Sequence, residues 1–205
     1  MNVYPIEAGN FKLDGGAMFG VVPKSLWTKT NPADADNMIE MSSRCMLVES
    51  SDKLILVDTG MGDKQSEKFF KYYKRWGSDN LVKSINSAGF SIDDVTDVLL
   101  THLHFDHCGG AVAWDSSKEA YDVLFKNANY WSNKKHWDWA TSPNPREKAS
   151  FLDENLFPIK ESGQLKFINN MSKGFNYCEE LGLEILCVDG PVSYTHLTLP
   201  TISDV

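Results

Sequence analysis

The sequence predicts a domain of mixed α and β structure, and three observations lead to that prediction. Short apolar runs bounded by polar residues, such as residues 54–57, have the length of buried strands. Stretches with apolar residues at helical spacing, such as residues 65–76, lie between those runs. A cluster of histidine and aspartate directly follows the run 95–101, as polar residues do where a strand ends in a functional loop.

The N-terminal half is predicted to contain an early hairpin, three strands and two helices. Residues 11–22 combine apolar side chains with Gly15 and Gly16, which suit a hairpin turn. Gly89 is expected to end the second helix, and Ser91 begins a capping box before the third strand. In chain order, the two strands, the two helices and the last strand are residues 44–49, 54–57, 65–76, 81–88 and 95–101.

The C-terminal half is predicted to hold three strands and two helices. Ser132 is suited to cap a helix that continues through His136 and Trp139. Pro143 and Pro145 break that helix, because proline lacks the backbone N–H that a helix interior needs. The other elements are a strand, the start of a helix and two late strands, at residues 128–131, 146–155, 165–168 and 183–188.

Three of the five histidines and one aspartate lie within residues 102–107, which predicts a metal centre. Imidazole and carboxylate groups are ligands for zinc and similar divalent ions. In an extended segment alternate side chains point the same way, so His102, His104 and Asp106 share one side. His107 breaks the alternation, and a turn there would aim it at a second ion. The alternative is a chance cluster of polar residues in a surface loop.

This segment resembles the His-x-His-x-Asp-His signature of the metallo-β-lactamase superfamily. Residues 54–60 resemble the earlier strand and turn of that family, which end in an aspartate near the metals. Residues 95–101 resemble the strand that delivers the signature. The resemblance implies the αββα metallo-β-lactamase sandwich, in which two sheets are flanked by helices. Apolar periodicity alone supports only mixed α and β structure.

The resemblance also implies a role for each residue of the site. His102 and His104 would hold the first metal ion, and Asp106 and His107 the second. Asp106 would in addition be the catalytic residue that orients the attacking water or assists proton transfer. Asp58 would hydrogen bond a ligand and fix its orientation, or else would only cap the turn that follows it.

The activity implied is that of a hydrolase that uses a metal-activated hydroxide. The cofactor would be zinc, two ions in the full-length parent protein, although other divalent metals suit the same ligands. Residues 137–151 resemble an insertion in hydrolases similar to quorum-quenching lactonases, and Phe105 is shared with many such lactonases. The small-molecule substrate is therefore expected to be a lactone or another ester. A thioester or phosphodiester substrate is the alternative, as is a catalytically inactive metal-binding fragment.

The tryptophans of residues 137–151 admit two interpretations. They would form an apolar wall for an acyl chain, or they would serve as core or dimer contacts, which we favour. The oligomeric state is left open. His136, alone among these tryptophans, is expected to be structural or on the surface.

The C-terminal end departs from the family pattern. The family's third metal histidine, bridging aspartate and last histidine are not found, although residues 183–190 resemble the strand that leads to the third histidine. Residues 192–201 resemble the translation of a common sequencing adapter. We therefore expect residues 1–191 to be a partial metallo-β-lactamase-like domain with its C-terminal part missing, and residues 192–205 to be a non-native tail that contains His196. The alternative is a genuine polar tail.

Composition limits the classes of partner. A net charge of −8 makes the chain a poor candidate for binding nucleic acid through phosphates. No apolar run approaches the ~20 residues needed to cross a bilayer, and residues 1–7 lack the pattern of a secretory signal. The four cysteines form no Cys-x-x-Cys pair, so reduced thiols in the cytoplasm are expected. Cys108 is expected to pack behind the site rather than bind metal.

Overall fold

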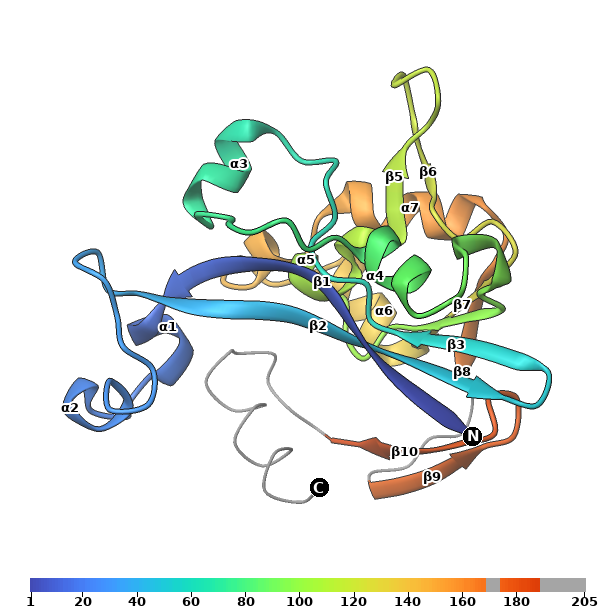
Figure 1. Cartoon of the computed structure of the whole chain (residues 1–205), viewed down its shortest axis with the longest axis horizontal. Helices are drawn as coiled ribbons and strands as arrows, with labels where there is room; N and C mark the ends of the chain where they lie inside the picture. Colours follow the sequence, from blue (N-terminus) through green and yellow to red (C-terminus); the bar gives the residue numbers. More distant parts are fainter. Residues whose placement is uncertain (169–173, 189–205) are drawn as a thin grey trace.

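A computed structural model describes residues 1–168 and 174–188 (Figure 1). Its main feature is a six-stranded sheet with the order β1-β2-β3-β4-β7-β8. The first three strands pair antiparallel, whereas β3, β4, β7 and β8 pair parallel. The strands are β1 (Asn2–Asp14), β2 (Met38–Ser50), β3 (Lys53–Val57), β4 (Asp97–Leu99), β7 (Asn129–Asn133) and β8 (Leu165–Ile168).

Helices occupy the connections of this sheet, as parallel strands require. The longest of them, α4, α6 and α7, contribute buried residues to the largest apolar cluster of the protein. The helices are α1 (Gly15–Phe19), α2 (Lys24–Trp27), α3 (Glu67–Tyr72), α4 (Leu81–Ser87), α5 (Phe105–Cys108), α6 (Lys134–Thr141) and α7 (Asp153–Glu161). None of these described helices has the length and apolar character needed to cross a membrane.

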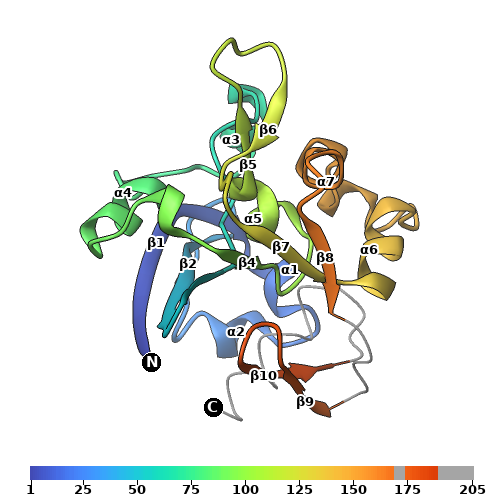
Figure 2. The ribbon, with the colours of Figure 1, turned by 90° about the vertical axis from the view of Figure 1, so that its right-hand side faces the viewer.

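The two faces of the sheet carry separate apolar cores. Leu56 and Val98 belong to the cluster that contains the helices, whereas Ile55 and Leu99 belong to a second cluster. Successive side chains of a strand point to opposite faces, which accounts for the division. The second cluster includes residues of a two-stranded sheet formed by β9 (Gly174–Cys178) and β10 (Leu183–Cys187). Figure 2 shows this small sheet apart from α6 and α7. The order of layers is thus helix, sheet, sheet.

The outer face of the small sheet is apolar and exposed. Phe175 and Tyr177 are each 68% exposed, so no part of the described chain covers them. The expectation that the C-terminal part of the sandwich is missing stays a prediction. The predicted tail, residues 192–205, lies outside the described residues and stays a prediction.

Two predictions for the N-terminal half are wrong. Residues 11–22 form no hairpin, because β1 continues to Asp14 and pairs with β2, and α1 begins directly afterwards. The Asp14 carboxylate caps α1 by accepting a hydrogen bond from the Ala17 N–H at 2.8 Å. The helix expected at residues 65–76 is only α3, and it has no continuous apolar stripe, because Tyr72 and Trp76 are 67% and 46% exposed.

The C-terminal half also differs from the prediction in detail. The helix expected to start at residue 146 begins at Asp153, after a short 3-10 turn at Lys148–Ser150. Asn133 rather than Ser132 caps α6, through its side chain and the His136 N–H. The hairpin of β5 (Val112–Trp114) and β6 (Tyr121–Val123), which projects at the top of Figure 1, was not expected. The capping box at Ser91 is confirmed.

Candidate metal centre

The predicted signature lies where β3 and β4 end. Parallel strands bring their carboxyl ends to one edge of the sheet, so Asp58 after β3 lies beside Thr101 after β4. The Asp58 carboxylate accepts hydrogen bonds from the Thr101 N–H at 2.9 Å and from the Thr101 hydroxyl at 2.8 and 2.9 Å. The pairing of β3 with β4, two strands that the apolar runs 54–57 and 95–101 predict, therefore places Asp58 next to Thr101.

The structure brings all four predicted ligands together. The extended alternation expected through Asp106 is wrong, because α5 begins at Phe105 and places Asp106 and His107 in a helical turn. The ring centroids of His102 and His104 are 4.8 Å apart, and those of His102 and His107 are 4.0 Å apart. Asp106 Oδ2 is 3.8 Å from His107 Nε2. Among residues 1–168 and 174–188, no group of three or more His, Cys, Asp or Glu side chains is placed to hold one ion. The resemblance implies two ligands from this segment for each of two ions, and that division stays a prediction.

Burial sets the protonation of the site. His104 is 2% exposed, and burial, with neighbouring histidine charge, lowers its pKa to about 3. Burial also lowers the pKa of His102 far below its ordinary value. Both rings are therefore neutral at pH 7, as metal ligands must be. Burial raises the pKa of Asp106, whose Oδ1 is buried and accepts no hydrogen bond within the described part of the chain. The neutral imidazoles and this carboxylate therefore suit the binding of a cation.

Asp58 contacts His107 directly. Its Oδ2 lies 2.8 Å from His107 Nδ1, which leaves Nε2 for another partner. Burial lowers the pKa of His107, but the hydrogen bond and charge of Asp58 outweigh burial, so that pKa lies above its ordinary value. Asp58 also has a φ of +59°, a strained conformation that its side-chain hydrogen bonds offset. The contact expected of Asp58 is present, and its role at a metal stays a prediction.

The segment 59–64 supports the second half of the signature and the glycines that follow it, residues 106–110. The His107 carbonyl accepts hydrogen bonds from the Thr59 N–H at 2.8 Å and from the Thr59 hydroxyl at 2.9 Å. A Cβ added to Gly109 or Gly110 would lie 2.2 Å from a backbone oxygen of this segment. The glycine pair is therefore needed for close backbone approach. Lys64, which the sequence analysis missed, is buried and donates to the Gly109 carbonyl.

Residues 133–152 contact the first half of the signature, residues 102–104. His136 Nε2 accepts a hydrogen bond from the Leu103 N–H at 3.0 Å. The Phe151 ring packs against His104 with centroids 4.9 Å apart. His136 is thus structural, as expected, but its contact with the signature was missed, because a lone histidine in a helix gives no sign of its partner.

Cys108 and Trp137 lie in the core, as the favoured interpretations predict, whereas Trp139 does not. Cys108 is fully buried, its thiol donates to the Leu103 carbonyl at 3.3 Å, and burial raises its pKa to about 12. Trp137 is buried and packs against Phe167, whereas Trp139 is exposed and donates to Glu147. Within the described part of the chain, no ring contact or hydrogen bond joins either tryptophan side chain to the four predicted ligands.

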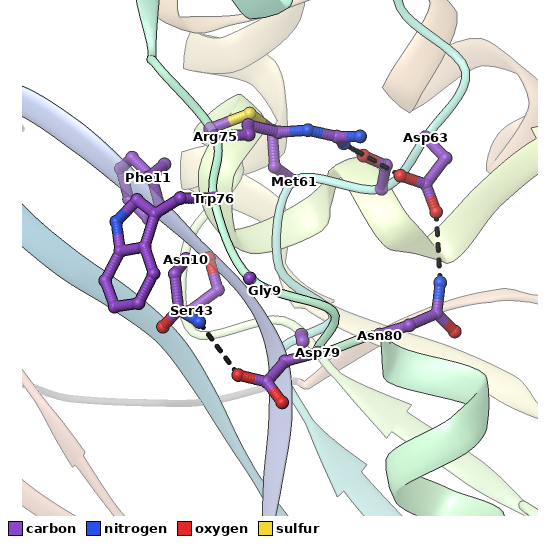
Figure 3. A pocket seen from close by; sticks show the side chains of 13 residues that line it. Gly9, Asn10, Phe11, Ser43, Met61, Asp63, Arg75, Trp76, Asp79 and Asn80 are labelled. Atoms are coloured by element: carbon purple, nitrogen blue, oxygen red, sulfur yellow. Dashed lines mark hydrogen bonds and ion pairs between the residues drawn. The ribbon is translucent and has the colours of Figure 1, made fainter.

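A cavity of about 200 Å³ lies beside segment 59–64, but none of the predicted ligands lines it (Figure 3). Its walls come from β1, β2, residues 61–63 and residues 75–80. Its polar side chains largely satisfy one another: Arg75 bonds Asp63 at 2.8 Å, and Asn10 donates to Asp79 at 2.8 Å. The cavity is therefore separate from the candidate metal centre.

Known proteins resemble this chain in sequence and in structure. An N-acyl homoserine lactonase of Bacillus cereus is 26% identical over 176 residues, which are 78% of this chain and 67% of that protein. A solved structure of a probable metal-dependent hydrolase from Staphylococcus aureus is 30% identical with a TM-score of 0.74, and the alignment covers 85% of this chain and 60% of that one. AidC, a dizinc quorum-quenching lactonase solved in complex with a product, is 27% identical with a TM-score of 0.60, covering 85% and 61%.

The chain therefore spans about 60% of the length of these two solved relatives. Their likeness confirms the predicted fold class. The model of the metallo-β-lactamase superfamily matches residues 39–198, which is more than half of the sequence. The chain belongs to the metallo-β-lactamase superfamily.

Proposed function

We propose that this chain carries part of the active site of a metal-dependent hydrolase that cleaves a lactone or another ester. The observation that carries the proposal is the cluster of His102, His104, Asp106 and His107 at the edge of the sheet, with Asp58 bonded to His107. The similarity to an N-acyl homoserine lactonase supports a lactone as the substrate.

The proposed ligands divide between two ions, with zinc as the proposed metal. His102 and His104 would hold the first ion, and Asp106 and His107 the second. Such ions supply a hydroxide nucleophile at neutral pH and polarise the carbonyl oxygen of the substrate. Iron, manganese and cobalt suit the same imidazole and carboxylate ligands.

The protein's own groups would orient the reactants. Asp106 is proposed to orient the attacking water and to accept its proton at Oδ1, the buried oxygen without a described hydrogen-bond donor. The hydrogen bond to Asp58 would keep the His107 ring in one orientation.

Aromatic residues beside the signature support a substrate with an apolar part. The Phe105 ring packs against Phe69 and Tyr73, with centroids 5.4 and 4.9 Å away. Phe69 and Tyr73 remain partly exposed, so an apolar group has a surface to contact near the ligands. This arrangement favours an acylated lactone over a phosphodiester, whose charged group gains little from aromatic contacts.

The test is hydrolysis by the zinc-loaded protein. We expect an N-acyl homoserine lactone to be hydrolysed faster than an alkyl thioester or a phosphodiester. His104→Ala and Asp106→Ala should abolish turnover, while Asp138→Asn, an exposed change on α6, should preserve it. Unchanged turnover in either alanine variant would refute the assignment.

A second candidate function is metal binding without catalysis. It follows from the proposed division of ligands, because this chain supplies only two of them for each ion. Two tightly held ions per chain would support the hydrolase, and one weakly held ion or none would support the binding fragment. Equilibrium dialysis followed by elemental analysis measures this stoichiometry.

A further inference from the structure

The peptide groups on both sides of Leu103 are held by side chains from elsewhere. The Leu103 N–H belongs to the peptide that joins it to His102, and it donates to His136 Nε2 at 3.0 Å. The Leu103 carbonyl belongs to the peptide that joins it to His104, and it accepts from the Cys108 thiol at 3.3 Å. Because each peptide group is planar, these two bonds restrict the backbone between the two predicted ligands.

His136 is the more distant and more specific of the two partners. It lies on α6, 33 residues from Leu103 in sequence. A backbone N–H only donates, so Nε2 of His136 must accept and the proton of the neutral ring must be on Nδ1. The Leu103 side chain is fully buried on the core side, which leaves its backbone N–H as the point where α6 acts on the signature.

Phe151, which follows the 3-10 turn Lys148–Ser150, links His136 of α6 to a ligand ring. Its ring centroid lies 5.8 Å from that of His136 and 4.9 Å from that of His104. His136 therefore reaches the His-x-His segment in two ways, by a hydrogen bond to its backbone and by aromatic packing through Phe151.

We propose that His136 is a positioning residue that fixes the relative orientation of His102 and His104 through its hydrogen bond to the Leu103 N–H. This inference rests on the proposed function, since it takes these two histidines to be ligands. Outer contacts that orient metal ligands typically change metal affinity 10- to 100-fold. We expect about a tenfold loss when His136 can no longer accept the bond.

The experiment compares His136→Leu, which cannot accept, with His136→Gln, whose amide oxygen can. Asp138→Asn on the exposed side of α6 is the matched control. Hydrogen exchange of the Leu103 amide is followed by NMR in the metal-free protein labelled with ¹⁵N-leucine. Zinc affinity is measured by competition with a chromophoric chelator. His136→Leu should speed exchange at Leu103 and weaken zinc binding about tenfold, and His136→Gln should restore most of both.

The outcomes separate this inference from the proposed function. Equal zinc affinity in wild type and His136→Leu, or unchanged exchange at Leu103, would overturn the positioning role alone. Failure of the wild type to bind zinc would overturn the proposed function and this role with it. If His136→Leu does not fold, His136→Asn replaces it, because its amide is one methylene shorter than that of His136→Gln. Equal zinc affinity in the Asn and Gln variants would then contradict the inference.

Discussion

The two halves of the His-x-His-x-Asp-His segment are supported in different ways. Residues 106–110 lie against segment 59–64, whose backbone approaches them so closely that no side chain fits at either glycine, and which donates hydrogen bonds from both backbone and side chains. Residues 102–104 are supported from the side by α6 and Phe151, through one hydrogen bond and ring packing. The first support is a backbone contact that any added atom disturbs, whereas the second consists of side chains that can be exchanged.

The difference also reflects where each support comes from in the chain. Segment 59–64 directly follows β3, and β3 pairs with β4, which leads into the signature. Strand pairing alone therefore brings the first support to the site. The second support arrives on α6, after the β5–β6 hairpin and β7, so that its position depends on helix packing.

The largest expected effect tests the backbone contact. In Gly110→Ala, the new Cβ would lie 2.2 Å from the Thr59 carbonyl oxygen, and two backbone segments would have to separate. We expect the free energy of unfolding to fall by about 3 kcal/mol, at the upper end for overpacking. Urea denaturation followed by circular dichroism measures the change.

The control for this variant is Gly163→Ala. Gly163 has a φ of +76° but no atom within 4 Å of an added Cβ, so the control reports backbone strain alone, about 1 kcal/mol. Gly110 has no positive φ, so its loss reports the close approach to segment 59–64 alone. A loss in Gly110→Ala no larger than the strain loss in Gly163→Ala would contradict the expected size of this effect, and the contrast between the two supports would fail.

The next effect concerns Asp58, which connects both halves through Thr101 and His107. Asp58→Asn retains a residue that tolerates a positive φ but removes the charge, and we expect a loss of about 2 kcal/mol. In the folded protein burial lowers the pKa of His107, but Asp58 raises it above the ordinary value of 6.5. The stabilisation that the Asp58–His107 pair gives the folded protein is therefore complete below pH 6.5. It is lost as pH rises through the raised pKa of His107.

The measurement for Asp58→Asn is unfolding of the metal-free protein across this pH range. The difference in free energy of unfolding between wild type and variant should be largest in acid and should become smaller at higher pH. NMR titration should show a lower pKa for His107 in the variant. A difference that grows with pH would contradict the role of the Asp58–His107 pair.

The sequence was informative where function depends on local order. Residues 102–107 identify themselves by their ligand types and spacing, and the apolar runs at 54–57 and 95–101 predict the strands that place them. Asp58 was singled out only through the resemblance of residues 54–60 to the family's strand and turn.

The sequence was less informative where structure depends on distant partners. The aromatic residues of 65–76 suggest one long helix, but α3 is short, because Phe69 packs on Phe105 while Trp76 pairs with β1 at Asn10. Residues 11–14 continue β1 because β2 lies alongside, a pairing that no local pattern reveals. The hydrogen bond of His136 belongs to the same class, since its partner is set by how α6 packs.

The smallest expected effect tests the side-chain support. Phe151→Leu keeps an apolar group but removes the ring that contacts His104 and His136, and we expect a loss of about 1 kcal/mol. Phe157→Leu, a partly exposed position on α7, is the control and should cost less. Because Leu103 keeps its hydrogen bond to His136, zinc affinity should fall less in Phe151→Leu than in His136→Leu. A greater loss of zinc affinity in Phe151→Leu would mean that ring packing, rather than the hydrogen bond to Leu103, holds this half of the signature. Thermal unfolding measures the loss of stability, and chelator competition on the same protein samples measures the loss of zinc affinity.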